Sequence, residues 1–264
     1  MKERPSFPAR LDFSGAGAGL APAAAPGGRN ANASTAKLAA PLQPQGHGLD
    51  STAVRMNMVR KLAGQGIIDP HVLHAMRTVE RHRFVDTALV NQAYEDTSLP
   101  IGLGQTISKP GVVSRMAELL RNGAPGPLGR VLEIGTGCGY QAAVLSLLAR
   151  EVYSIERLRG LHDKARGNLR HLRLPNLHLL FGDGMAGYAK GAPYAAIIAA
   201  AGGEAVPQAW IDQLAIGGRL VAPVMCGKVG SGQQALMVVD KGPDGVRQTL
   251  LEPVHFVPLK SGVA

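Results

Sequence analysis

The sequence predicts an α/β fold: a doubly wound, mostly parallel sheet covered by helices on both faces. From residue 131 onward, short apolar runs alternate with segments that carry apolar residues at helical spacing, which is typical of parallel strands joined by helices. The last two apolar runs are joined instead by a turn at Gly242, Pro243, Asp244 and Gly245. We therefore expect an antiparallel C-terminal hairpin at the sheet edge and helices in the N-terminal part.

The first 50 residues differ in composition from the rest of the chain. They are rich in Ala, Gly and Pro and hold few large apolar residues, so they bury too little surface to offset the entropy of ordering. We expect residues 1–50 to be a disordered extension and residues 51–264 to form one folded domain. Within that domain, residues 51–125 would supply helices and a long loop, and residues 126–264 would form the sheet.

Two helices are expected ahead of the loop. Apolar side chains recur every four residues from Val54 to Leu62, which predicts an amphipathic helix that breaks at Gly64. The second helix should begin at Pro70, because proline suits the first helical position and Asp69 is a good N-cap.

The segment from Ser98 to Pro110 reads S-L-P-I-G-L-G-Q-T-I-S-K-P and predicts a loop. It is interrupted by glycine and proline, has little charge and carries several hydroxyl groups. It precedes a helix that should start near Gly111, and it lies just ahead of the sheet, where it is placed to cover a ligand site. An ordered connector without a binding role is the alternative, and the segment alone does not separate the two.

The alternating region then gives the order of the sheet elements. The expected strands cover residues 131–134, 152–155, 177–181, 194–200, 219–224, 234–240 and 248–257, and the expected helices cover residues 140–149, 158–172 and 207–214.

A glycine-rich turn follows the first strand, in the stretch V-L-E-I-G-T-G-C-G-Y. Glycines permit backbone conformations closed to other residues and let a ligand approach the main chain. The dinucleotide fingerprint is G-x-G-x-x-G, and here the third glycine comes one residue too early. The acidic-x-G-x-G-x-G order instead resembles the first motif of S-adenosylmethionine-dependent methyltransferases, and a turn without a ligand is the alternative. The expected cofactor-binding residues are Glu133, Gly135, Thr136, Gly137 and Gly139.

Two further acidic residues end later strands. Glu156 follows the turn by about 20 residues, where a carboxylate is placed to accept the ribose hydroxyls of a nucleoside. This spacing does not separate NAD from S-adenosylmethionine, and an ion pair with Arg157 or Arg159 is the other interpretation. Asp183, in a G-D-G turn with Gly184, is expected to accept a hydrogen bond from the adenine amino group. Arg157 and Gly184 belong to the same expected cofactor site.

Composition limits the classes of partner and compartment. The net charge of +9 and a pI near 9.9 raise nucleic acid as a partner. Residues 1–60 hold seven basic against three acidic residues, so +4 comes from there and +5 from the remainder, with no dense basic block and few aromatics. We expect no nucleic-acid partner. The sequence has no apolar run of membrane-spanning length and no secretory leader, so we expect a cytoplasmic protein without a membrane partner.

Metal and disulfide chemistry is not expected either. The two cysteines, Cys138 and Cys226, match neither a disulfide framework nor a metal cluster, which agrees with a reducing compartment.

From about Met56 to the C-terminus, the chain resembles the protein-L-isoaspartate O-methyltransferase family. The most specific match is I-G-x-G-Q-T-I-S-x-P, and further matches are R-F-V-D at 83–86, V-L-E-I-G-T-G-C-G-Y-Q from residue 131, P-Y-A-A-I-I at 193–198 and F-V-P-L at 256–259. The chain departs from the family at Leu103, where bacterial members often carry glutamine, and at Cys138, where serine is frequent. Neither departure removes a group that the chemistry needs.

This resemblance implies methyl transfer from S-adenosylmethionine to the free α-carboxylate of an L-isoaspartyl residue in a damaged protein. The ester then closes to a succinimide, whose hydrolysis returns part of the material to aspartate. The fold implied is the Rossmann-like methyltransferase fold, and the partners implied are isoaspartyl proteins and peptides, bound by a monomer. The family's active-site serine falls on Ser108, with Thr106 beside it. The resemblance adds Gln105 and Ile107 to the cofactor site and assigns the substrate to Gln105, Ser108, Val257, Pro258 and Leu259.

The implied chemistry explains why the sequence offers no convincing His/Asp pair. A carboxyl of this type has a pKa of about 3.5 and is ionised at neutral pH, so it needs no general base. Alignment is what remains for the enzyme to supply, and alignment contributes roughly 7 to 11 kcal/mol. Hydroxyl and backbone N–H groups would hold the carboxylate without a positive charge to weaken it as a nucleophile.

Three other functions fit parts of the pattern. A nucleic-acid methyltransferase would suit the basic pI, but the N-P-P-Y, D-P-P-Y and Pro-Cys elements of those enzymes do not occur. A nicotinamide-dependent oxidoreductase is opposed by the position of Gly139. A nucleoside-binding module without catalysis is the third alternative.

Overall fold

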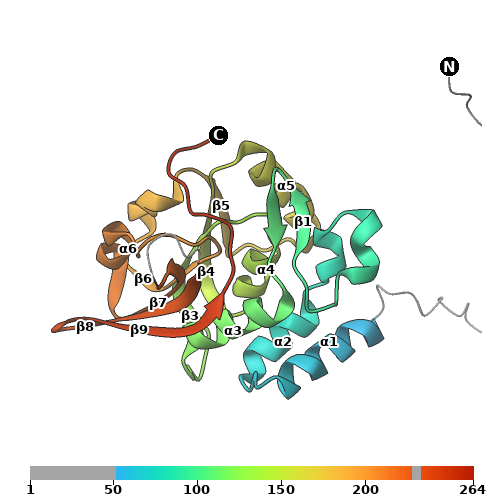
Figure 1. The fold of residues 1–264 in the computed structure, drawn as a ribbon, viewed down its shortest axis with the longest axis horizontal. Coiled ribbons are helices and arrows are strands. Elements are labelled where there is room, and N and C mark those ends of the chain that lie inside the picture. Colours follow the sequence, from blue (N-terminus) through green and yellow to red (C-terminus); the bar gives the residue numbers. More distant parts are fainter. Residues whose placement is uncertain (1–51, 228–232) are drawn as a thin grey trace, which may run out of the picture. The chain divides into compact units, whose positions relative to one another are not determined.

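A computed structural model describes residues 52–227 and 233–264 (Figure 1). The expected extension, residues 1–50, lies outside the described residues. Seven strands form one sheet in the order β5-β4-β3-β6-β7-β8-β9. Their bounds are β3 Leu128–Ile134, β4 Ala149–Glu156, β5 Leu177–Phe181, β6 Tyr194–Ala199, β7 Leu214–Met225, β8 Gln234–Gly242 and β9 Gly245–Val254.

The strand directions confirm the predicted topology. The first five strands of the sheet order, β5 to β7, pair in parallel, whereas β7 with β8 and β8 with β9 pair antiparallel. The chain leaves β3 toward β4 on one side and returns to β6 on the other. The strand order therefore reverses at β3, and ligands of doubly wound sheets bind outside the strand ends at such a point.

Alternate residues of the strands face opposite layers of helices. Val131 and Val152 lie in a cluster with apolar side chains of α3 (Pro110–Arg121) and α4 (Tyr140–Ser146), whereas Leu132 and Ile155 lie in a cluster with Trp210 of α6 (Gln208–Gln213). The helix α5 (Arg159–Leu169) packs with α4. Because helices cover both faces of these strands, side chains on both faces are buried, which explains the continuous apolar runs in the sequence.

The N-terminal helices form as predicted, α1 at Thr52–Gly64 and α2 at Pro70–Thr78. The Asp69 carboxylate accepts hydrogen bonds from the backbone N–H groups of His71 and Val72 at 2.8 and 3.2 Å, as an N-cap should. Short 3₁₀ helices η1 (Arg81–Phe84) and η2 (Thr87–Gln92) follow. No helix in residues 52–227 or 233–264 has the length and apolar character needed to cross a bilayer.

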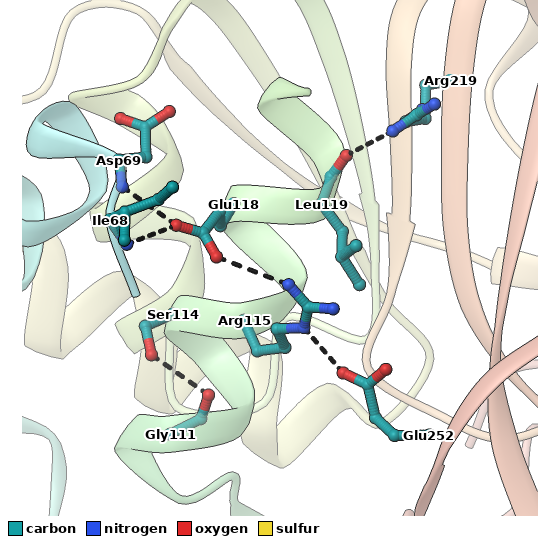
Figure 2. A network of polar contacts seen from close by, with 9 residues as sticks. All are labelled: Ile68, Asp69, Gly111, Ser114, Arg115, Glu118, Leu119, Arg219 and Glu252. Carbon is teal, nitrogen blue, oxygen red and sulfur yellow. Dashed lines mark hydrogen bonds and ion pairs between the residues drawn. The ribbon is translucent and has the colours of Figure 1, made fainter. Parts of the chain in front are cut away.

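A polar network on α3 joins the N-terminal helices to the sheet (Figure 2). One Glu118 oxygen accepts the backbone N–H groups of Ile68 and Asp69 at 2.7 and 2.9 Å, just before α2. One turn earlier, Arg115 donates to Glu252 of β9 at 2.7 Å. The helix thus carries contacts to two parts of the chain that are more than 180 residues apart.

The segment expected to be a loop, residues 98–110, contains a β-hairpin instead. Strands β1 (Leu99–Gly102) and β2 (Gln105–Ile107) pair antiparallel in a sheet of their own. The loop prediction was wrong here because the glycines indicate breaks in the sequence, whereas in the structure Leu103 and Gly104 adopt the left-handed conformations of a two-residue turn.

The bounds of several helices and strands also differ from those expected from the sequence. The helix α4 ends at Ser146, three residues earlier than expected, because β4 begins at Ala149. The strand expected at 219–224 begins earlier, because β7 starts at Leu214, and its first residues form an irregularity in the pairing with β6. Strand β9 ends at Val254 rather than at residue 257.

Candidate active site

The glycine-rich turn lies at the carboxyl end of β3, where the strand order reverses. Gly135, Gly137 and Gly139 have φ values of 89°, 57° and 92°, so each occupies the left-handed region that favours glycine. The Gly135 N–H donates to the carbonyl of Ile155 in β4 at 2.9 Å, and the Ala200 N–H, just after β6, donates to Ile134 at 2.8 Å. The turn is therefore held between the tips of the two neighbouring strands.

Glu156 is held in place by two backbone groups. Its Oε2 accepts the Gly137 N–H at 2.9 Å and its Oε1 accepts the Leu158 N–H at 2.9 Å. Within the described ranges it forms no ion pair with Arg157 or Arg159, which was the other interpretation of this residue. A carboxylate oxygen has a second lone pair, so both oxygens retain capacity to accept a ligand hydroxyl.

A cavity of about 480 Å³ opens beside this turn. Three segments far apart in the sequence meet around it: the β1–β2 hairpin, the tips of β3 and β4, and the residues after β9. Most of the sequence-predicted site residues line it, namely Gln105, Thr106, Ile107, Ser108, Gly135, Thr136, Gly137, Glu156, Arg157, Gly184, Val257, Pro258 and Leu259.

Glu133 does not line the cavity, although the sequence placed it in the cofactor site. Its side chain is fully buried behind the turn, where Oε2 accepts a hydrogen bond from Ser154 at 2.5 Å and Ser154 in turn bonds Thr136. Burial raises the pKa of the Glu133 carboxyl to about 8. Its Oε1 has no hydrogen-bond partner among the described residues. The structure thus places Glu133 beneath the turn rather than at the ligand surface.

Gly139 and Asp183 also lie outside the cavity lining. A Cβ at Gly139 would come within 2.7 Å of Leu169, so this glycine permits α4 and α5 to pack closely. Both oxygens of Asp183 accept backbone N–H groups, from Met185 at 2.8 Å and from Gly262 at 2.6 Å. The contact with Gly262 comes from the C-terminal segment, which the sequence did not connect with this carboxylate.

The C-terminal segment runs along the tips of the strands. Leaving β9, it bonds Gly202 through Val257 and Leu259, each at 2.8 Å. Its last residue, Ala264, forms backbone hydrogen bonds with Arg157 and Arg159, just after β4. Arg157 Nε donates to the Gly262 carbonyl at 2.9 Å. Residues 257–260 of this segment line the cavity.

The hydroxyl groups assigned to chemistry lie on the hairpin side of the cavity. Thr106 is exposed and Ser108 is half-buried, and neither hydroxyl has a hydrogen-bond partner among the described residues. Between them, Ile107 is buried in the apolar cluster beneath the hairpin. The alternation along β2 explains why one side chain anchors the strand while its neighbours remain available.

Sequence reasoning missed several residues that border the cavity. Gln141 lies there with both amide atoms unpartnered within the part of the chain that the structure describes. Tyr140 and Cys138 are buried there, and burial raises the pKa of Tyr140 to about 12 and raises that of the Cys138 thiol. Ala200 borders it from the tip of β6. Ala200 could have been predicted from its position at the carboxyl end of an expected strand. Nothing in the sequence distinguishes Gln141 from the other residues of its helix.

Comparison with known sequences gives a family. The family model described as protein-L-isoaspartate(D-aspartate) O-methyltransferase matches residues 53–264. The protein-L-isoaspartate O-methyltransferase of Methylibium petroleiphilum is 58% identical, with 99% of this chain and 98% of that protein covered. That of Leptothrix cholodnii is also 58% identical, with 89% and 83% covered.

Comparison with solved structures agrees with this family. A structure described as protein-L-isoaspartate O-methyltransferase has a TM-score of 0.71 and 27% identity, and covers 79% of this chain and 67% of that one. A Plasmodium falciparum protein in complex with S-adenosyl-L-homocysteine has a TM-score of 0.66 at 23% identity, over 78% and 98%, which bears on the fold alone. The chain belongs to the protein-L-isoaspartate(D-aspartate) O-methyltransferase family.

Proposed function

We propose how this chain carries out the reaction of its family, which moves a methyl group from S-adenosylmethionine to the free α-carboxylate of L-isoaspartyl residues in damaged proteins. The observation that carries the proposal is the shared cavity. The β1–β2 hairpin with its free hydroxyl groups and the glycine turn with Glu156 border the same space of about 480 Å³. A donor at the turn and an acceptor at the hairpin would therefore meet.

The residues around the turn fit a nucleoside-bearing methyl donor. Gly135 and Gly137 leave the main chain accessible, and the Glu156 carboxylate is oriented by two N–H groups so that it faces ribose hydroxyls. Gly184 must lack a side chain, since a Cβ there would lie 2.5 Å from Ile134. When bound, S-adenosylmethionine supplies an electrophilic methyl group on a sulfonium.

Glu133, Gly139 and Asp183 act on this site from outside the lining. Glu133 supports the turn through Ser154 and Thr136. Gly139 permits the close packing of α4 and α5 behind it. Asp183 remains able to accept a hydrogen bond from an adenine amino group, because each of its oxygens uses one lone pair on a backbone N–H.

The hairpin and the C-terminal segment hold the acceptor. Ser108 and Thr106 donate hydrogen bonds to the substrate carboxylate, which is already ionised, so no residue has to remove a proton. Main-chain groups near Val257, Pro258 and Leu259 bind the substrate backbone on the opposite side, with Gln105 closing the space between. Binding through main-chain groups accommodates substrates of varied sequence.

Labelled S-adenosylmethionine tests the proposal directly. The purified chain is incubated with an isoaspartyl peptide, with the aspartyl peptide of the same sequence and with RNA. We expect label in the isoaspartyl peptide as a base-labile ester, and none in the other two. Label in RNA, or in the aspartyl peptide alone, would contradict the proposal.

The setting of the enzyme is also a proposal. We propose a cytoplasmic monomer that binds damaged proteins and neither nucleic acid nor membranes. The proposal is supported by the low cysteine content, two residues in a spacing that matches no disulfide framework, and by the spread of basic charge. Light scattering during size-exclusion chromatography should give the mass of one chain, and a dimer mass would contradict it.

A further inference from the structure

The tip of the β1–β2 hairpin carries a leucine where the turn favours glycine or asparagine. Gly102 pairs with Gln105, so Leu103 and Gly104 form a two-residue turn with φ values of 53° and 68°. Turns of this kind need a positive φ at both central positions and usually have Asn-Gly, Asp-Gly or Gly-Gly there. A leucine in the left-handed region costs roughly 1–2 kcal/mol more than glycine would.

Core packing does not account for this leucine. Leu103 is 62% exposed, in contrast to Ile101 on the same hairpin, which is 2% exposed. The Leu103 Cδ1 approaches Gly160, at the start of α5, where a Cβ would lie only 3.0 Å away. The side chain therefore rests on bare backbone on one side and faces solvent on the other.

The hairpin that presents Leu103 is anchored at its base. Lys164 of α5 donates to the Ile101 carbonyl at 2.9 Å and pairs with Asp86 at 3.0 Å. Leu103 itself borders the cavity, on the same wall as Thr106 and Ser108. An exposed apolar side chain is thus held at a fixed place, at the entrance to the site of chemistry.

We propose that Leu103 forms an apolar subsite for the side chain of a residue that flanks the isoaspartyl residue. Strained residues of this kind are found where function requires them, and the function that this position allows is contact with the substrate beside its reacting carboxylate. The inference rests on the proposed function of the cavity. With this subsite, the enzyme favours isoaspartyl residues that have apolar neighbours in the substrate sequence over those that have charged neighbours.

Two isoaspartyl peptides that differ only in their flanking residues, leucine or lysine, test the inference. The wild-type enzyme should have a kcat/KM about 10-fold higher for the leucine-flanked peptide, the lower end of what an apolar contact contributes to specificity. Leu103→Asn keeps a residue suited to the turn but removes the apolar surface. This variant should reduce the ratio of the two kcat/KM values to within about twofold, because the KM for the leucine-flanked peptide increases. Leu103→Met keeps an apolar side chain and should therefore keep the preference for the leucine-flanked peptide.

A matched control separates contact from a general effect on the surface. Ile216 is 70% exposed and lies on β7 outside the cavity lining, so Ile216→Asn should leave both kinetic constants unchanged for both peptides. A wild type without preference, or a Leu103→Asn variant that loses activity equally toward both peptides, would overturn the subsite. Failure of every variant and of the wild type to methylate either peptide would instead overturn the proposed function, and the subsite with it.

Discussion

At the scale of single residues, the least expected feature is a fully buried carboxyl group beneath the glycine-rich turn. Glu133 has an exposed fraction of 0%, and burial raises its pKa to about 8, above the ordinary 4.5. The folded protein therefore keeps this proton at neutral pH, whereas the unfolded chain releases it above about pH 4.5. The free energy of unfolding therefore decreases as the pH rises from 4.5 to about 8.

Glu133→Gln should remove this pH dependence. In the wild type, the contribution of Glu133 to the free energy of unfolding should be full below pH 4.5 and should decrease up to about pH 8, by on the order of 5 kcal/mol at most. The glutamine has no proton to lose, so the difference between variant and wild type should grow with pH across this range. Urea unfolding at pH 5, 6.5 and 8 measures it. Parallel stability curves for the two proteins would contradict the assignment.

Ser108 gives the sharpest catalytic prediction at this scale. Removal of one hydrogen-bond donor that aligns the reacting group lowers kcat by roughly 10²–10³-fold in comparable sites. Ser108→Ala should therefore reduce kcat, while the affinity for S-adenosylhomocysteine, measured by calorimetry, changes little because Glu156 and the glycine turn lie elsewhere in the cavity. An unaltered kcat would remove Ser108 from the mechanism.

At the scale of elements, the C-terminal segment contacts two residues that the sequence assigns to the cofactor site. The Gly262 N–H donates to Asp183 at 2.6 Å, and the Gly262 carbonyl accepts from Arg157. Gly262 has a φ of 74°, so this backbone position suits glycine. Asp183 and Arg157 are thus both oriented by Gly262, which lies 79 and 105 residues later in the chain.

Gly262→Pro should weaken cofactor binding. Proline lacks the N–H and cannot adopt the positive φ, so the hydrogen bond to Asp183 is lost, at a cost of about 1.5–3 kcal/mol for a bond to a charged group. Calorimetry with S-adenosylhomocysteine should show an affinity reduced roughly 10-fold or more. The exposed neighbour provides the control, since Val263→Ala should bind as the wild type does. Equal affinities for all three proteins would exclude a positioning role.

At the scale of the whole molecule, a buried ion pair joins α2 to α3. Arg121 is 2% exposed, donates to Asp69 at 2.8 Å and also bonds the carbonyls of Ala124 and Gly126. Burial raises the pKa of Asp69, but Arg121 and the N–H groups of the helix cap outweigh it, so the pKa lies below its ordinary value. The pair holds the N-terminal helices against the part of the chain that continues into the sheet.

Arg121→Met should destabilise the protein by about 3 kcal/mol, because it leaves Asp69 without its partner. Two probes distinguish a global effect from a local one. The single tryptophan, Trp210, reports on the sheet through its fluorescence, and far-ultraviolet circular dichroism reports on all helices. We expect coincident transitions in urea for the wild type and the variant. An earlier dichroism transition in the variant would show that the N-terminal helices unfold separately.

Much of the architecture could be predicted because the signals are local. Strand and helix alternation, the Asp69 cap and the left-handed glycines at 135, 137 and 139 depend on a few neighbouring residues, and the structure agrees with each. The β1–β2 hairpin was missed for the converse reason. Glycines that interrupt a loop and glycines in or beside a tight turn look alike in the sequence until the partner strand is known.

The sequence by itself determined the fold class and the family motifs, since these follow from short-range pattern and backbone chemistry, and through the family resemblance it placed 13 of the residues that line the cavity. Only the tertiary structure decided that Glu133 lies behind the turn, that Gly262 bonds Asp183 and that Leu103 stands exposed at the entrance. These facts depend on which distant segments approach one another. Burial, and hydrogen bonds between residues far apart in the sequence, depend on how distant segments pack. This packing produces no periodic pattern in the sequence from which it could be predicted.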